Sequence, residues 1–306
     1  MNAGFYGLAT ESLESKYLRL EFLADAGPRV VRLMLAGSDE NLLAQVPDLS
    51  VDTPFGKFFF RGGHRLWHSP ESFPGSYIPD NEGLDVQRVT DGFLLHQPTE
   101  APTGIQKSME IHLDPGRPAL TVHHVLQNNG TAPVELAAWA ITQLPLGGIA
   151  ILPQRAAPVD DEGLLPNRNL VLWPYTEWSD SRLAFHNDYL LFDAQARSTP
   201  CKVGYLNQAG WMGYLRGGIL FVKRFQPQMG RPHPDFSCNA EVYGRDRFVE
   251  LETIGALERL EPGDVTSHTE SWELYPGLEQ TRNVDQIRDM VRRLNFQDVP
   301  GTASQS

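Results

Sequence analysis

Residues 61–71 place two arginines, two histidines, a tryptophan and a glutamate within one short segment of the 306-residue chain. Charged groups of both signs beside an aromatic ring suit a polar, ring-shaped ligand. The Gly62-Gly63 pair allows a sharp turn or a close backbone approach, and Pro70 argues against a helix. The segment predicts a binding loop or strand end that lines one groove; the alternative is a turn in which Trp67 caps the core and the arginines form surface ion pairs. The candidate side chains are Arg61, His64, Arg65, Trp67, His68 and Glu71.

A second candidate is the segment 241–253, which contains three glutamates. Side chains alternate between the two faces of a strand, so Glu250 and Glu252 share one face. Two like carboxylates on one face repel, and burial would raise the pKa of at least one of them. Such a group suits proton transfer near neutral pH, with Glu241 as a further ligand-binding residue. An exposed polar face on a one-sided antiparallel strand is an equal alternative.

Residues 136–144 give a third candidate, because Trp139 and Gln143 share one face of a predicted strand. An indole can stack against a sugar ring, and an amide can hydrogen-bond the hydroxyls of the sugar. Taken alone, this pattern favours a core tryptophan with a satisfied amide over a binding site.

No motif indicates a metal or a nucleotide cofactor. His64 and His68 have the i, i+4 spacing of a metal-binding pair on a helix, but no helix is expected there. The chain contains no HExxH, no GxSxG, no phosphate-binding loop and no dinucleotide fingerprint. We therefore predict no metal and no cofactor. A metal-dependent hydrolase or lyase that uses His64, His68 and Glu71 is the least favoured alternative.

Composition and charge limit the partners of the protein. The chain carries 38 acidic and 26 basic side chains, which gives a net charge of −12. Nucleic acids and anionic membranes need a concentrated cationic face, so neither is an expected partner. Cys201 and Cys238 form neither a disulfide framework nor a zinc motif. No secretory signal and no membrane-spanning apolar run is visible, so a cytoplasmic location is expected. The sequence does not indicate an oligomeric state.

Short apolar runs punctuated by 27 glycines and 23 prolines predict many strands joined by turns. Residues 17–23 alternate with a period of two, and Asn283 caps a predicted C-terminal helix. We predict a mostly β protein: one large antiparallel β-sandwich over residues 1–278, then a helix and a frayed tail over 279–306. Further strands are expected at 29–35, 92–97, 105–113, 119–128, 134–144, 218–225, 241–243, 248–253 and 265–274.

Three parts of the chain resemble the galactose mutarotase-like superfamily, which includes the aldose 1-epimerases. Residues 27–33 with 40–43 resemble its opening hairpin and "eNll" element, and Arg61-Gly62-Gly63 resembles the "RGG" start of its sugar-phosphate epimerase branch. Residues 249–253, with 260–263 and 272–274, resemble its catalytic-glutamate strand and its "L-x-PG" turn. Together the three parts span most of residues 15–276.

The resemblance implies an antiparallel supersandwich whose concave face binds a small-molecule carbohydrate and interconverts its anomers without a cofactor. In the family, a glutamate takes the proton of the anomeric hydroxyl and a histidine protonates the ring oxygen. Glu252 aligns with that glutamate, and Trp139 falls at or near the position of the histidine. Since an indole is no general acid at neutral pH, either His64 or His68 supplies the proton or the protein binds sugars without epimerising them.

Overall fold

Alternating apolar side chains give many strands of this chain one face that packs in the interior. In the computed structural model, which describes residues 4–295, Leu18, Leu20 and Phe22 are fully buried, whereas Arg19 and Glu21 are half-buried. The predicted alternation is therefore confirmed at this strand. The predicted frayed tail, residues 297–306, lies outside the described residues.

One sheet has ten strands, and all of its pairings are antiparallel. We call it the pocket sheet, because the candidate site lies on its outer face. Its strands, in spatial order, are β1 (Thr10–Glu14), β2 (Leu18–Leu23), β3 (Arg29–Leu35), β6 (His64–Ser69), β11 (Val134–Leu144), β20 (Val249–Ile254), β19 (Ala240–Gly244), β16 (Cys201–Tyr205) and β13 (Val171–Leu172), with β21 (Glu258–Leu260) paired to β11.

The other sheet, the back sheet, also has ten antiparallel strands. A separate hairpin pairs β4 (Gln45–Thr53) with β5 (Gly56–Gly62). The back-sheet strands, in spatial order, are β14 (Leu183–Phe185), β15 (Tyr189–Asp193), β12 (Ile149–Pro153), β17 (Trp211–Arg216), β18 (Ile219–Phe225), β22 (Val265–Tyr275), β10 (Ala119–Asn128), β9 (Ile105–Leu113), β8 (Gly92–His96) and β7 (Asp85–Val89).

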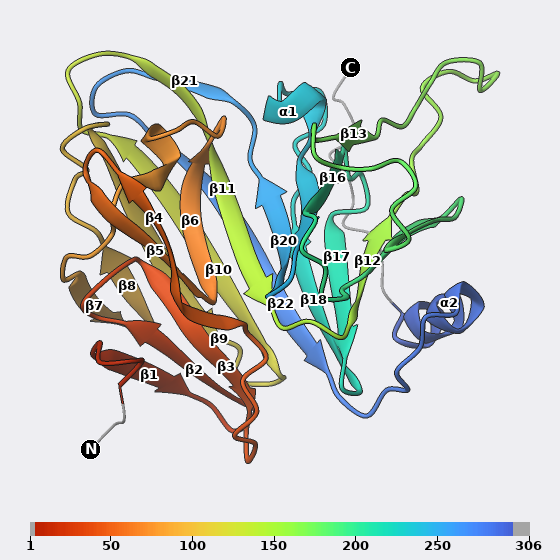
Figure 1. The fold of residues 1–306 in the computed structure, drawn as a ribbon, viewed down its shortest axis with the longest axis horizontal. Helices are drawn as coiled ribbons and strands as arrows, with labels where there is room; N and C mark the ends of the chain where they lie inside the picture. Colours follow the sequence, from red (N-terminus) through yellow and green to blue (C-terminus); the bar gives the residue numbers. More distant parts are fainter. Residues whose placement is uncertain (1–3, 296–306) are drawn as a thin grey trace.

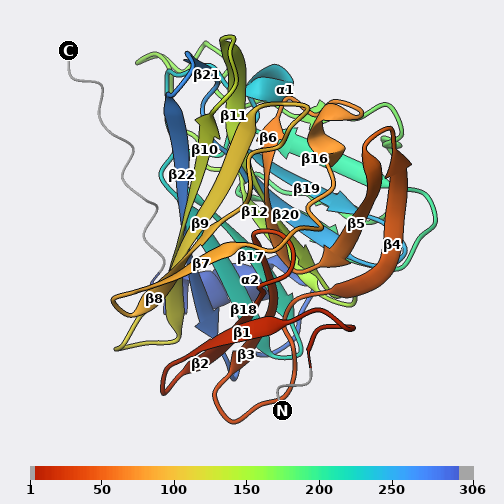
Figure 2. The ribbon, with the colours of Figure 1, turned by 90° about the vertical axis from the view of Figure 1, so that its left-hand side faces the viewer.

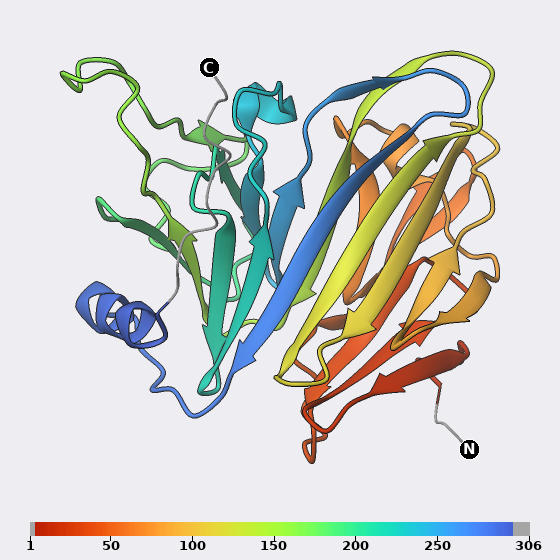
Figure 3. The ribbon, with the colours of Figure 1, turned by 180° about the vertical axis from the view of Figure 1, so that it is seen from behind.

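The two sheets pack face to face around one large apolar core (Figures 1 and 3). Strands β6, β11 and β20 stand in front of the back sheet in Figure 1, and β22 and β10 face the viewer in Figure 3. Figure 2 shows the β4–β5 hairpin on the side of the pocket sheet that faces away from β22. The predicted mostly β sandwich is therefore confirmed. Among residues 4–295, no helix is long and apolar enough to cross a membrane.

The junction between β5 and β6 depends on the glycine pair. Gly62 and Gly63 have φ values of 93° and 73°, in the left-handed region that favours glycine. A Cβ atom on either would lie 2.0 Å from a backbone carbonyl oxygen, that of Ala44 or Val30. The chain therefore passes from the hairpin into the pocket sheet at a point where only glycine fits. Of the predicted loop or strand end over residues 61–71, the first two residues end β5, residues 64–69 form the complete strand β6, and residues 70 and 71 follow it.

Few segments are helical. The one-turn segments are η1 (Gly75–Tyr77) and α1 (Pro234–Ser237), and the latter is a left-handed turn with φ between 52° and 68° at Asp235, Phe236 and Ser237. The longer helix α2 (Val284–Arg293) packs Ile287 and Met290 against the outer face of the back sheet. Its amphipathic spacing explains why it was predictable from the sequence.

Asn283 caps α2 as predicted, since its Oδ1 accepts from the backbone N–H groups of Asp285 at 2.8 Å and Gln286 at 3.2 Å. We expect Asn283→Ala to lower the free energy of unfolding by about 1 kcal/mol, because these helix N–H groups lose their acceptor. Asn283→Asp, which retains an acceptor, should lose much less. Urea denaturation of both variants measures this, and equal losses in both would contradict the capping role.

Candidate functional site

A pocket of about 380 Å³ lies on the outer face of the pocket sheet. The hairpin β4–β5, the segment after β6, the loop 173–175 and the turn 245–247 surround it. Eight of its 17 lining residues are aromatic and seven are charged. A concave pocket of this size that combines aromatic rings with convergent polar groups is typical of a small-molecule site. Its lining residues are Leu49, Phe60, Arg65, Trp67, Glu71, Tyr77, Trp139, Trp173, Tyr175, Pro200, Lys202, Tyr243, Arg245, Asp246, Arg247, Phe248 and Glu250.

Strand register brings together the polar side chains on the outer face of β11, β20 and β19, which form the floor of the pocket. Across β11, β20 and β19, Ile141 pairs with Glu252 and Glu252 with Glu241. In the neighbouring row, Gln143 pairs with Glu250. Because alternate residues face the same side, these side chains point away from the core between the sheets.

Lys202 joins two of the buried carboxylates. Its Nζ lies 2.7 Å from Oε2 of Glu241 and donates to Oε2 of Glu252 at 2.9 Å. The indole N–H of Trp139 donates to the same Glu252 oxygen at 2.8 Å. Burial disfavours the charged form of Lys202, but the two carboxylates outweigh this effect and raise its pKa well above the usual value. Burial raises the pKa of Glu241 well above its usual value.

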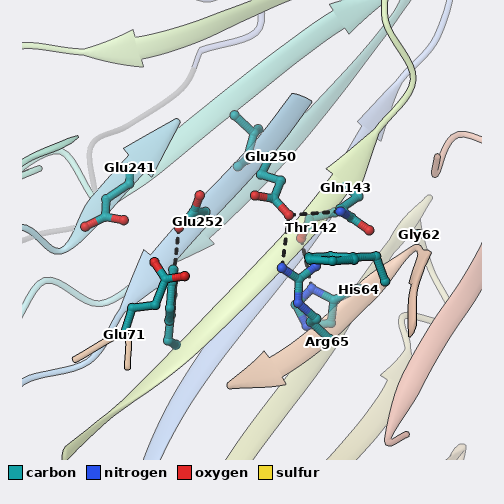
Figure 4. Close-up of polar contacts among 12 residues, drawn as sticks. Gly62, His64, Arg65, Glu71, Thr142, Gln143, Glu241, Glu250 and Glu252 are labelled. Carbon is teal, nitrogen blue, oxygen red and sulfur yellow. Dashed lines mark hydrogen bonds and ion pairs between the residues drawn. The ribbon is translucent and has the colours of Figure 1, made fainter. Parts of the chain in front are cut away.

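Arg65 and Gln143 hold the third carboxylate. Both donate to Oε1 of Glu250, each at 3.0 Å. Burial raises the pKa of Glu250 above its usual value, although the Arg65 charge opposes this shift. Figure 4 shows Glu241, Glu252 and Glu71 on one side of the site and the contacts of Glu250 on the other. The floor thus offers two separate carboxylate environments, each with its own cation.

Aromatic rings form the wall of the pocket beside this floor. The Trp67 ring centroid lies 5.4 Å from that of Trp139 and 4.8 Å from that of Tyr77. The phenol of Tyr77 donates a hydrogen bond to Glu71. Arg65 lies over Trp67, 4.4 Å from its ring centroid. These contacts fix the rings at the edge of the pocket, where they present apolar faces to a ligand.

No family model and no curated protein sequence matches this chain. Solved structures do match. A galactose mutarotase-like protein from Lactobacillus casei aligns over 87% of this chain and 100% of its own, with a TM-score of 0.57 and 10% identity. A candidate aldose 1-epimerase from Klebsiella pneumoniae aligns over 100% of this chain and 90% of its own, with a TM-score of 0.59 and 10% identity. The fold is that of the galactose mutarotase-like proteins.

A third solved structure places the same fold in a longer protein. A TPR-domain containing protein from Parabacteroides distasonis aligns over 92% of this chain, with a TM-score of 0.60 and 18% identity. The present chain spans 51% of that protein. At these identities the comparisons establish the galactose mutarotase-like fold and leave the chemistry to the residues of the site.

Eight of the eleven predicted site residues gather at this pocket. Three of them, Gln143, Glu241 and Glu252, are fully buried behind its lining. The other five line it; they are Arg65, Trp67, Glu71, Trp139 and Glu250.

The prediction that His64 lines the groove is wrong. His64 belongs to the opposite face of β6 from Arg65, because the two are adjacent in one strand. Its ring is fully buried between the sheets, where Nε2 lies 2.7 Å from Nε2 of His124 and Nδ1 lies 2.9 Å from Oγ1 of Thr142. In this galactose mutarotase-like fold, His64 therefore cannot supply a proton to a ligand in the pocket.

The same prediction is wrong for His68 and Arg61. His68 is four residues from His64 in β6 and shares its face, where the charges of Lys107 and Glu100 influence it. Arg61 has a φ of 58° and donates instead to Asn81, outside the pocket. None of the described residues that line the pocket is a histidine.

One group of described side chains has the composition of a metal site. Donor atoms of His64, His124 and Glu270 lie within 4.8 Å of one another. However, the two Nε2 atoms share a hydrogen bond, and Glu270 pairs with the ammonium of Lys223 at 2.8 Å. A cation beside the carboxylate and a hydrogen bond between the imidazoles suit a polar network that connects the sheets rather than a metal.

The buried histidines predict a loss of stability at acidic pH. Burial lowers the pKa of His68 and His124 to about 4 and that of His268 to about 3, from 6.5. Below pH 6.5 the unfolded chain therefore binds protons that the native state does not, so stability falls as the pH drops toward 4. Each histidine contributes a slope of up to about 1.4 kcal/mol per pH unit. Urea denaturation between pH 7.5 and 4.5 measures this slope, and an unchanged free energy of unfolding would contradict it.

Several pocket residues were missed by the sequence analysis. They are Tyr77, Trp173, Tyr175, Lys202 and Tyr243. Lys202 could have been predicted, because it is the single charged residue of strand β16. A buried lysine requires a partner carboxylate, and the three glutamates of 241–253 were the candidates. Trp173 and Tyr175 come from a loop, Tyr77 ends η1 and Tyr243 lies in β19, and none of the four stood out in the sequence as Lys202 did.

Proposed function

We propose that the pocket binds a carbohydrate. Carbohydrate rings present apolar C–H faces and polar hydroxyl edges, which suit aromatic walls beside carboxylates and cations. Trp67, Trp139 and Tyr77 supply such walls, and Glu250 supplies an acceptor whose Oε2 has no partner among the described residues. The galactose mutarotase-like fold supports this assignment.

We further propose that the protein interconverts sugar anomers, with Glu252 as the base. The observation that carries this proposal is the environment of its carboxylate. Lys202 and Trp139 both donate to Oε2, and Oε1 is buried without a hydrogen-bond partner in the described part of the chain. An anion held in place with one open acceptor is suited to taking a proton from a hydroxyl group. The chemistry is proton transfer and requires no metal or cofactor.

The second candidate is a non-catalytic carbohydrate-binding protein. Two observations favour it: both predicted acids, His64 and His68, lie on the face of β6 opposite the pocket, and Glu252 is fully buried behind Trp139 and Lys202. In this case the same pocket would hold the sugar without opening its ring.

Polarimetry of freshly dissolved aldoses tests the proposal. With the protein present, we expect the optical rotation to reach equilibrium faster, in proportion to protein concentration. Sugar binding, measured by tryptophan fluorescence, should saturate in the same samples, because Trp67 and Trp139 line the pocket. Saturable binding without faster mutarotation would favour the second candidate, and the absence of both would reject the pocket as a carbohydrate site.

A further inference from the structure

We propose that Lys202 is the catalytic proton donor of this pocket and protonates the ring oxygen of the bound aldose. The inference rests on the proposed anomer interconversion, which requires a base and an acid near one sugar ring. It assigns the acid to a lysine on β16 instead of a histidine.

The contacts of Lys202 fit this role. The residue lines the pocket, although only 4% of its surface is exposed. Its ammonium donates to Glu252 at 2.9 Å and forms an ion pair with Glu241, whose Oε2 lies 2.7 Å away. The ammonium also lies over the rings of Trp139 and Trp173, 4.7 and 4.6 Å from their centroids. An ammonium has three N–H donors, so one remains for a ligand oxygen.

The other pocket donors are less suitable. Trp139 also contacts Glu252, but an indole does not release its proton near neutral pH. Arg65 is paired with Glu250, and a guanidinium keeps its proton at any relevant pH. The phenol of Tyr77 already donates to Glu71. Of the described pocket-lining residues, Lys202 alone combines a releasable proton with direct contact to the proposed base.

This contact couples the two proton transfers. The negative charges of Glu241 and Glu252 raise the pKa of Lys202. When Glu252 takes a proton from the sugar it becomes neutral, which removes one of these charges. The ammonium then becomes a stronger acid at the moment when the ring oxygen gains negative charge. Because an alkoxide is far more basic than an amine, the proton moves from Lys202 to the ring oxygen.

The step is balanced without a further reactant. The O–H bond of the anomeric hydroxyl breaks and its proton passes to Glu252, while the anomeric carbon and its oxygen form a carbonyl. The bond from the anomeric carbon to the ring oxygen breaks, and its electron pair stays on the ring oxygen, which takes a proton from Nζ of Lys202. After rotation, ring closure returns both protons and restores the ammonium and the carboxylate.

Two substitutions of Lys202 test the role. Lys202→Met should lower kcat by about 10²–10⁴-fold, the usual contribution of a general acid or base. Lys202→Arg retains the charge and the donors but does not release a proton, so its kcat should be similarly low while sugar affinity stays within a few-fold of wild type. Lys202→Met leaves Glu241 and Glu252 without their shared cation, and the double variant Lys202→Met/Glu241→Gln removes one of these two charges. It replaces the single variant in the test if that variant is unstable. Lys57→Met, on the exposed hairpin, is the matched control with wild-type activity.

The outcomes separate this inference from the function on which it rests. A folded Lys202→Arg variant with near wild-type kcat would overturn proton donation and leave only a role for the charge. Near wild-type kcat in Lys202→Met, or in the double variant, would overturn any catalytic role of Lys202. In both cases the proposed function stands. Absence of turnover in the wild-type protein would reject the proposed function, and this inference with it.

Discussion

Glu252→Gln is expected to slow anomer interconversion by about 10²–10⁴-fold, because glutamine keeps the shape of the side chain but cannot accept the proton. Sugar affinity should change much less, because the glutamine amide can still form a hydrogen bond with a hydroxyl group of the sugar. The amide oxygen can still accept from Trp139, which donates to the carboxylate at 2.8 Å in the native protein. Polarimetric rates and fluorescence titrations of the variant and the wild type measure both quantities.

Glu261→Gln is the matched control, because Glu261 is an exposed glutamate in the turn after β21. Its turnover and affinity should equal those of the wild type. Undiminished turnover in Glu252→Gln would remove this residue from the mechanism. A parallel loss of affinity and turnover would instead indicate that the substitution disrupts the floor of the pocket.

Lys223→Met is expected to lower the free energy of unfolding by about 3–5 kcal/mol, the usual cost of leaving a buried charge without its partner. Lys223 and Glu270 are both fully buried between the sheets, with Nζ and Oε1 2.8 Å apart. The ammonium also donates to the backbone carbonyls of Ala140 at 2.8 Å and Leu251 at 3.0 Å. It therefore supports β11 and β20, the two strands that carry much of the pocket floor.

Guanidinium denaturation at pH 7 measures this effect. The double variant Lys223→Met/Glu270→Gln should recover part of the loss, because it removes the charge left unpaired in the single variant. A single variant as stable as the wild type would show that this pair does not stabilise the sandwich. The double variant also separates the contribution of charge from that of the lost hydrogen bonds.

Local alternation predicted much of the fold and part of the site. The predicted ranges 105–113, 119–128 and 134–144 coincide with β9, β10 and β11. Glu250 and Glu252 were expected on one face of a strand, and the register of β20 places both on the outer face of the pocket sheet. These features depend only on residues that are close together in the chain, so they could be predicted from the sequence.

Other strands carried no such pattern. β12 and β16 are buried on both faces, so their side chains do not alternate between apolar and polar. In β6, His64 and Arg65 are equally polar, and alternation cannot show which of them faces the pocket. The partner of Lys202 depends on the pairing of β16 with β19, a contact between segments far apart in the sequence. Contacts of this kind depend on which strands pair, so they could not be predicted from the local sequence.

The pocket is proposed to bind a reducing sugar and to interconvert its anomers. Exchange NMR of an equilibrated aldose tests this proposal most directly, because binding and turnover are observed in one sample. We predict cross-peaks between the α and β anomeric protons that are absent without protein, appear with the wild-type protein and are much weaker with Glu252→Gln. Saturable binding of the sugar without exchange cross-peaks would contradict anomer interconversion and identify a binding protein instead.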